Sequence, residues 1–168
     1  EANLALMRRY WSLDKEGVLI AQSNLANCHS QMGQDKEALR QKRHVHASWE
    51  ALLGPSDPHS ITSLVCLAIS LLKLHCFAEA KALLREKTPV VQRALGPDHD
   101  LTLRLNELLA HALFENSAAT IDDVREAEML LQESLRRRWR VFGPTHPQTL
   151  DIETELSRAR KRLAELSN

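Results

Sequence analysis

Apolar residues recur along the chain at the three- and four-residue spacing that is typical of helices burying one face. Glycine and proline gather between these segments, where they favour turns. The pattern predicts a trailing helix at about residues 1–12, three helix pairs, and an unpaired helix at about residues 146–165. Because strong helix formers dominate and β-branched runs are few, the predicted fold class is all-α.

The pattern also repeats along the chain. Leu-Gly-Pro at residues 53–55 returns 42 residues later at 95–97, and Phe-Gly-Pro follows after another 47 residues at 142–144. The five extra residues of the last interval fall between Phe114 and Asp123, where Thr120 and Asp123 resemble a capping box. A repeated helical unit of this length predicts a helical solenoid. Leu-Ala pairs recur 42 residues apart each time, at residues 25–26, 67–68 and 109–110. Glu-Ala pairs recur 42 and then 47 residues apart, at residues 37–38, 79–80 and 126–127.

The joint between repeats carries a specific motif. Gly-Pro-x-His-Pro-x-Thr-Leu is complete at residues 143–150, and the copy that begins at Gly96 keeps His99, Thr102 and Leu103. The chain therefore resembles the tetratricopeptide repeat, in the 42-residue form of the kinesin light chain family. HEAT or armadillo repeats have a similar period but do not predict the paired Leu-Ala and Glu-Ala positions.

The resemblance implies a right-handed α-solenoid that forms one domain over residues 1–168. Within it we expect a trailing helix of a preceding repeat and the first helix of a fourth repeat around three complete repeats. The predicted boundaries are 1–12 for the trailing helix, 13–53, 54–95 and 96–142 for the repeats, and 143–168 for the last helix. Pro89 predicts a kink or a split after Thr88 in the second helix of the second pair.

Composition narrows the class of protein. The chain has 168 residues with 22 Lys and Arg against 22 Asp and Glu, and this neutral balance argues against binding nucleic acid through the overall charge. The most apolar stretch, residues 61–72, is too short to cross a bilayer, so no membrane partner is expected. Three cysteines cannot all pair and form no C-x-x-C, which predicts a reducing, cytoplasmic location. Because the chain begins at Glu1, we expect a processed product or a piece of a longer protein.

No motif for catalysis, a cofactor or a metal is present. The phosphate-binding, nucleophile-elbow, zinc-protease and dinucleotide-binding patterns are all missing, so the chain is not expected to be an enzyme or to carry a cofactor. His44 and His46 are two residues apart, and on a helix they point away from each other, so they are not expected to share a metal ion.

First helices of a solenoid line a groove, and helical spacing identifies the residues that face it. A polar groove side chain can bond a peptide backbone, although a solvated helix face explains the same residues. The helix at residues 61–72 is apolar nearly all round, so Ile69 and Leu72 either anchor an apolar side chain of a peptide or are hidden by neighbouring helices. The predicted groove residues are Ser23, Asn27, Gln31, Val65, Ile69, Leu72, Lys73, Glu107, His111 and Arg158.

Basic residues concentrate near the carboxyl end. Residues 136–162 hold eight Lys and Arg against three Asp and Glu. Arginine beside tryptophan suits an acidic protein or RNA, although a solvated face with ion pairs one turn apart is the commoner explanation. The predicted basic patch consists of Arg136, Arg137, Arg138, Trp139, Arg140, Arg160, Lys161 and Arg162.

These observations predict a non-catalytic scaffold for protein–protein interaction, which binds a peptide or a partner protein in its groove. The chain is expected to be part of a larger chain or complex. The alternative function is binding of RNA or an acidic partner through the basic patch, which would depend steeply on salt.

Overall fold

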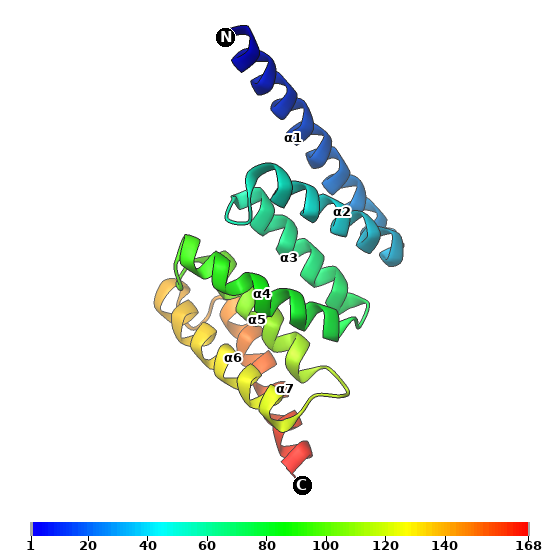
Figure 1. The fold of residues 1–168 in the computed structure, drawn as a ribbon. Coiled ribbons are helices and arrows are strands. Elements are labelled where there is room, and N and C mark those ends of the chain that lie inside the picture. Colours follow the sequence, from blue (N-terminus) through cyan, green and yellow to red (C-terminus); the bar gives the residue numbers. More distant parts are fainter. Residues whose placement is uncertain (1, 168) are drawn as a thin grey trace. The chain divides into compact units, whose positions relative to one another are not determined.

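The computed structural model describes residues 2–167, with the side chains of residues 15–167, and this part of the chain is helical without strands (Figure 1). Helices follow one another through short turns, as the sequence predicts for an all-α repeat. The helices in chain order are α1 (Ala2–Gln31), α2 (Asp35–Leu53), α3 (Pro58–Lys73), α4 (Phe77–Leu95), α5 (Asp100–Phe114), α6 (Ile121–Phe142) and α7 (Pro147–Ser167).

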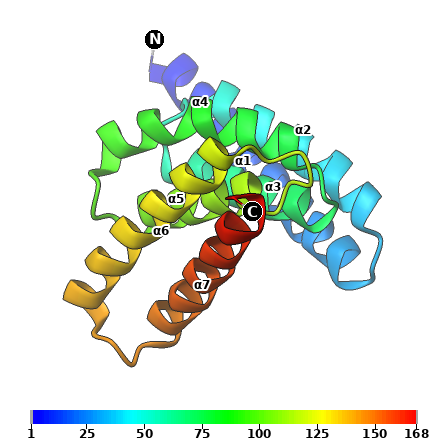
Figure 2. The same cartoon turned by 90° about the horizontal axis from the view of Figure 1, so that it is seen from below.

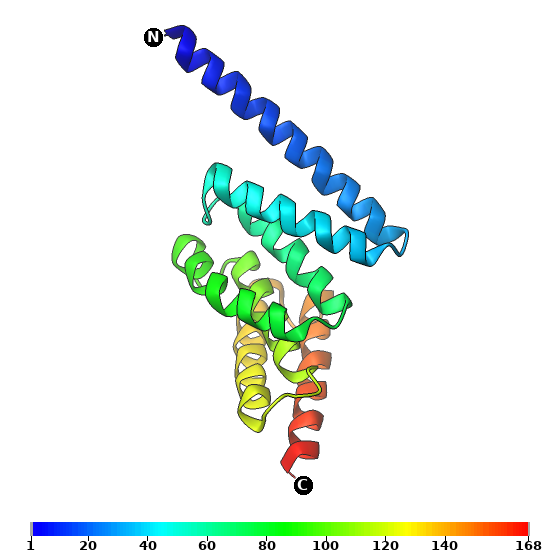
Figure 3. The same cartoon turned by 45° about the vertical axis from the view of Figure 1, so that its right-hand side comes forward.

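The chain divides into two compact units between Ser70 and Leu71. In the amino-terminal unit α1 packs against α2, around a core of Leu19, Val45 and Trp49. Figure 3 shows these two helices running past each other in opposite directions. In the carboxy-terminal unit α5 packs against α4 and α6, and α7 lies beside α6 (Figure 2). Each unit thus buries the apolar stripe of its helices against a neighbouring helix.

Glycine ends a helix at each repeat joint. Gly54, Gly96 and Gly143 have φ angles of 87°, 90° and 82° with ψ angles of 167°, 162° and 170°. This backbone region is open almost only to glycine. Pro58 and Pro147 then open the next helices, where the missing N–H removes no helical hydrogen bond. The predicted role of the Gly-Pro motif as a helix-to-helix joint is confirmed.

Replacing Gly96 by alanine is expected to lower the free energy of unfolding by about 1–3 kcal/mol, because alanine strains this backbone region. Crowding is not the reason, since nothing lies within 4 Å of the position of an added Cβ. Gly17→Ala is the matched control: Gly17 lies inside α1, also in open space, and its replacement should stabilise the helix by about 0.5–1 kcal/mol. Urea denaturation measures both, and equal effects of the two variants would contradict the assignment.

The five-residue insertion lies between α5 and α6 and ends in the predicted capping box, which is confirmed. Asp123 N–H donates to Thr120 Oγ1 at 3.1 Å, and Thr120 N–H donates to Asp123 Oδ2 at 3.3 Å. Burial raises the pKa of Asp123, but hydrogen bonds from Lys81 and Thr120 outweigh it and lower the pKa below its usual value. The insertion thus ends where the capping box, a feature of the local sequence, starts α6.

Two predictions about helix boundaries are wrong. The chain has no break between residues 12 and 13, because α1 runs from Ala2 to Gln31 as one helix through Gly17. A single glycine weakens a helix by only about 1 kcal/mol and no proline accompanies it, so the helix continues. Likewise α4 is not split at Pro89, because it runs as one helix from Phe77 to Leu95 whose buried face includes Leu84 and Val91 on either side of the proline, while the kink stays a prediction.

Candidate functional site

A cavity of about 380 Å³ lies among α1, α2 and α3 of the amino-terminal unit, and we call it the α1–α3 cavity. Side chains from α2 supply apolar surface, and α1 and α3 supply polar groups around it. The cavity is lined by Ile20, Ser23, Asn24 and Asn27 of α1, by Lys42, Val45 and Trp49 of α2, and by His59, Thr62, Ser63 and Cys66 of α3.

The apolar surface of the cavity is centred on a buried tryptophan. Trp49 is 3% exposed, packs with Leu19 and Val45, and stacks on His59 with ring centroids 4.6 Å apart. A buried aromatic ring in this setting presents a fixed apolar surface to whatever enters the cavity. The cavity therefore offers a place for an apolar side chain beside polar walls.

The polar walls differ in how much hydrogen-bonding capacity they offer. Ser23 donates to the Leu19 carbonyl at 2.8 Å, so this hydroxyl is already used. Ser63 donates to the Ser60 carbonyl at 2.7 Å and therefore accepts from His46 Nδ1–H at 3.0 Å. By contrast, Asn24 and Asn27 are exposed and carry both donors and acceptors. Of the groups on α1, these two amides are the best suited to hold a peptide backbone.

Lys42 of α2 also lines the cavity. Lys42 is 9% exposed, and its Nζ donates to Ser70 Oγ at 2.9 Å, while Ser70 donates to the Cys66 carbonyl at 3.1 Å. These hydrogen bonds hold the charge at a fixed place beside the polar wall. Lys42 was not predicted from the sequence, because a lysine is rarely buried, although its spacing from Ala38 and Val45 places it on the buried stripe of α2.

The structure brings together only part of the predicted groove in this unit. Ser23 and Asn27 line the α1–α3 cavity, while Gln31 lies exposed at the end of α1 and outside the lining. On α3 the cavity is lined by Thr62 and Cys66 rather than by the predicted Val65 and Ile69. Ile69 is 39% exposed and follows Cys66 by three residues, so it continues the same helical face. The sequence signal for this wall of the cavity was the spacing of four residues between Thr62 and Cys66, which places both on one face of α3.

In the carboxy-terminal unit, two predicted groove residues lie largely inside the fold. Leu72 is 6% exposed and belongs to the buried core, so its part in a binding pocket stays a prediction. Glu107 accepts hydrogen bonds from Arg138 Nε at 2.7 Å and from Arg104, which uses its carboxylate inside the fold. Lys73 is exposed at the end of α3.

Arg158 lines another cavity, of about 340 Å³, on the carboxy-terminal unit, and its positive charge acts on His111. Arg158 donates to Glu155 at 2.7 Å and to Glu115, and its guanidinium lies over the Phe114 ring. Burial lowers the pKa of His111, although Glu155 and Glu115 oppose the shift. The lining is Phe114, Glu115, Arg158, Lys161, Arg162 and Glu165, which mixes both signs of charge.

Arg138, predicted as part of the basic patch, is instead buried. Its side chain is 2% exposed and donates to Glu107 at 2.7 Å, to Asp100 at 2.9 Å and to Gln148 at 2.7 Å. The guanidinium also lies over the Phe142 ring, 5.9 Å from its centroid. The correction has a plain reason: its partners come from α5 and α7, and a run of four arginines and a tryptophan gives no hint of them.

Most of the remaining basic patch is neutralised by ion pairs. Trp139 is 50% exposed, and Arg140 and Lys161 are exposed. Ion pairs of this kind fit the solvated helix face that the sequence also allowed for these residues. The pairs are Arg136 with Glu133, Arg137 with Asp98 and Glu133, Arg160 with Glu128, and Arg162 with Glu165.

Among the described side chains, no three His, Cys, Asp or Glu residues lie close enough together to hold a metal ion. Over the same part of the chain, no helix combines the length and the apolar character needed to span a bilayer.

Comparison with known proteins adds independent information. The family profile described as tetratricopeptide repeat matches residues 18–59 and 116–148. The chain is 25% identical over 150 residues to a clustered mitochondria protein homolog of Aspergillus clavatus, and 24% identical over 150 residues to one of Aspergillus terreus. Each alignment covers 88% of this chain but 11% of the relative, so the chain spans about a ninth of the length of these curated relatives.

Solved structures agree with the fold. The chain matches, with a TM-score of 0.77 and 27% identity, a Podosopora anserina crystal structure described by its nearly identical TPR-like repeats of the kinesin light chain kind. The match covers 87% of this chain and 67% of that one, and a single-residue variant of the same protein matches equally well over 66% of its length. The predicted fold class, an all-α array of helix pairs, is confirmed.

Proposed function

Because the chain carries tetratricopeptide repeats of the kinesin light chain-like type, we propose that it is a non-catalytic scaffold that binds an extended peptide of a partner protein in the α1–α3 cavity. Tetratricopeptide repeats are generally protein-interaction scaffolds, and their fold is typically non-enzymatic. The observation that carries the proposal is the composition of this cavity: two exposed amides, Asn24 and Asn27, face an apolar surface at Trp49.

In the proposed mechanism, the polar and the apolar surfaces of the α1–α3 cavity bind different parts of the peptide. The amides of Asn24 and Asn27 bond the backbone of the peptide, which fixes its path without reading its sequence. An apolar side chain of the peptide enters the cavity against Val45 and Trp49 and leaves water. Ile69 extends the α3 wall beyond Cys66 and adds apolar surface to the same face.

Asn27→Ala is expected to weaken peptide binding by about 0.5–1.5 kcal/mol, because one hydrogen bond is lost. Ile69→Asp should weaken it more, because a charge placed beside a buried apolar side chain costs several times as much. A peptide selected from a displayed random library and followed by fluorescence anisotropy measures both. Met129→Asp is the matched control, since Met129 is 65% exposed on α6. Each variant must first show the wild-type helical signal and melting temperature.

The alternative function makes the opposite prediction. Arg136 and Arg140 are exposed, so their reversal to glutamate leaves the fold intact and removes charge from the basic patch. Under the proposal this double variant binds the selected peptide normally. If it abolishes binding while the folded Asn27 and Ile69 variants bind as wild type, the α1–α3 cavity is not the site. Affinity that falls steeply between low and moderate salt would support the same conclusion.

We also propose that the protein is located in a reducing compartment. Cys28, Cys66 and Cys76 are free thiols in the structure, which supports a reducing compartment such as the cytoplasm. Fractionation of cells that express the tagged chain tests this: recovery of the chain from an oxidising compartment would contradict it.

A further inference from the structure

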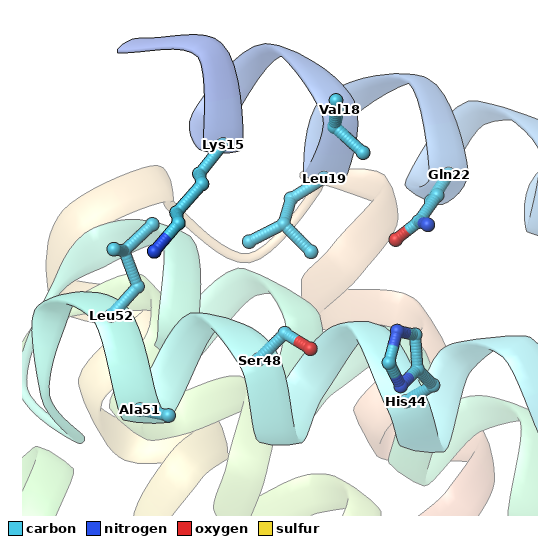
Figure 4. A pocket seen from close by; sticks show the side chains of 8 residues that line it. All are labelled: Lys15, Val18, Leu19, Gln22, His44, Ser48, Ala51 and Leu52. Atoms are coloured by element: carbon cyan, nitrogen blue, oxygen red, sulfur yellow. The ribbon is translucent and has the colours of Figure 1, made fainter. Parts of the chain in front are cut away.

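α2 contacts α1 and α3 through different faces. Figure 4 shows His44 and Ser48 of α2 pointing toward α1. Lys42 and His46 each lie two residues before one of these, about 200° around the helix, and they reach α3 instead. The face of α2 that meets α3 therefore carries a lysine and a histidine, where a helix ordinarily buries apolar side chains.

Two polar bridges connect this face of α2 to α3. In the first, Lys42 Nζ donates to Ser70 Oγ at 2.9 Å, and in the second, one turn further along α2, His46 Nδ1–H donates to Ser63 Oγ at 3.0 Å. Both serines in turn donate to backbone carbonyls of α3 itself, which fixes the direction of their hydroxyl groups. Each of the four side chains is at most 9% exposed, so both bridges are buried.

The bridges determine how α3 is rotated about its own axis. Because α3 is apolar nearly all round, several rotations bury a similar apolar area, and the hydrophobic effect alone selects none of them. A hydrogen bond is directional, so a bridge between two buried side chains forms at one rotation only. Ser63 and Ser70 lie seven residues apart, on one stripe of α3, and the bridges hold this stripe against α2.

This rotation turns polar side chains of α3 to the α1–α3 cavity. Half of the residues of α3 are aliphatic, yet among the described residues that line the cavity α3 supplies none of them. Rotation by one position, about 100°, would bring Val65 to the place of Cys66. The wall opposite Asn24 and Asn27 is polar for this reason, and its members are His59, Thr62, Ser63 and Cys66.

The next repeat has no such bridges. Forty-two residues later the four bridge positions are buried again, but three of them are apolar: they carry Leu84, Thr88, Leu105 and Ala112. In that helix pair the position equivalent to Cys66 is Leu108, which is 6% exposed, whereas Cys66 is half-buried and lines the cavity. The pair with bridges thus turns to the cavity a position that the pair without them buries.

We propose that the two bridges position the α3 wall for peptide binding, so that the positioning residues are Lys42, His46, Ser63 and Ser70. This inference rests on the proposed function and names the class of peptide that fits the cavity. Such a peptide has one apolar side chain, taken up against Trp49, and polar neighbours on the side that faces α3. A second apolar side chain there would remove water from the hydroxyl group of Thr62 without replacing its hydrogen bonds.

The test transplants the residues of the next repeat into the 168-residue chain. The bridge-free variant carries Lys42→Leu, His46→Thr, Ser63→Leu and Ser70→Ala. Because both partners of each bridge are replaced together, the melting temperature should equal or exceed that of the wild type. The peptide selected on the wild type should nevertheless bind about tenfold more weakly, because the wall is no longer preorganised.

A second peptide tests the selectivity of the cavity. It has leucine in place of the polar neighbour of the apolar side chain, and the wild type should bind it more weakly than the selected peptide. The bridge-free variant should bind the two peptides about equally. Ser134→Ala is the matched control, because Ser134 is a buried serine of α6 outside the bridges, and it should leave binding and selectivity unchanged.

Thiol labelling reports the rotation of α3 directly. In a chain with Cys28→Ser and Cys76→Ala the selected peptide should protect the remaining thiol, Cys66, from maleimide. In a second chain, which also has Cys66→Ala and Val65→Cys, the peptide should give no protection, because position 65 lies outside the lining. Without the bridges, protection should become similar at the two positions. Protection of Cys66 alone in the bridge-free variant overturns the proposal.

The remaining outcomes are distinguishable. If the four changes lower the melting temperature, each bridge is removed alone, as Lys42→Leu with Ser70→Ala or as His46→Thr with Ser63→Leu. A loss of stability in both pairs overturns the proposal, because the bridges then hold the fold rather than position a wall. If the bridge-free variant binds and discriminates as the wild type does, while Asn27→Ala weakens binding, this inference alone is wrong. If the peptide binds the wild type without protecting Cys66, the proposed function is wrong as well.

Discussion

Replacing Arg138 by alanine is expected to lower the free energy of unfolding by about 3–5 kcal/mol. The guanidinium is buried and donates to Glu107, Asp100 and Gln148, which come from α5 and α7. Its removal leaves the Glu107 carboxylate, 9% exposed, without its main cation. Urea denaturation followed by circular dichroism at 222 nm measures the effect.

The neighbouring arginine is the matched control. Arg137 pairs with Asp98 at 2.6 Å and Glu133 at 2.7 Å, but its side chain is 22% exposed and its partners are 73% and 45% exposed. Surface pairs of this kind contribute less than about 1 kcal/mol, so Arg137→Ala should change stability little. Replacing Arg138 and Glu107 together by Met and Leu should restore part of the loss, because no charge then stays buried. Equal destabilisation by the two alanine variants would contradict the buried role.

The pH dependence of Arg138→Ala follows from Glu107. Burial raises the pKa of Glu107, although hydrogen bonds and charges from Arg138 and Arg104 oppose the shift. A folded-state pKa above the unfolded one gives stability that is present at low pH and is lost as pH rises through the folded pKa. Without Arg138 this loss grows, so the gap between variant and wild type should be smaller near pH 4 than at pH 7. A gap that does not change with pH would show that packing alone explains the loss.

Trp49→Ala should destabilise the amino-terminal unit by about 3–5 kcal/mol. Trp49 is 3% exposed, packs with Leu19 and Val45, and stacks on His59, so truncation leaves a large void next to the α1–α3 cavity. The surrounding helices can relax into this void only in part, so most of the lost contact is not recovered.

Trp139→Ala serves as the comparison because Trp139 is 50% exposed on α6. Its removal should change the free energy of unfolding by less than about 0.5 kcal/mol. Circular dichroism is the better readout for both variants, since each removes a fluorophore. A similar loss of stability in both variants would mean that Trp49 does not hold the core of its unit.

The joints and the insertion could be predicted because their signals are local. Gly96, Gly143 and the Thr120–Asp123 capping box each combine a residue type with a backbone requirement that the next few residues reveal. Because the joints that contain these glycines return along the chain, they also predicted the repeat. Arg138 could not be predicted in the same way, since Asp100 and Glu107 lie 38 and 31 residues away.

Only part of the candidate site could be predicted, again because local signals are readable in the sequence and distant contacts are not. Ser23 and Asn27 follow from the helical spacing along α1, which is a local pattern. The opposite wall depends on how α3 is rotated about its axis, and rotation by one position replaces Val65 with Cys66. Because α3 is apolar nearly all round, its sequence does not determine this rotation.

The carboxylate of Asp123 accepts a hydrogen bond from the Thr120 N–H at the start of α6 and another from Lys81 of α4, 42 residues earlier. In a repeat protein, stability is the sum of the intrinsic free energies of the repeats and the coupling free energies between neighbours. One side chain therefore contributes to both quantities, and its removal should uncouple the two repeats as well as weaken one of them. The consequence is a broader, less cooperative unfolding transition.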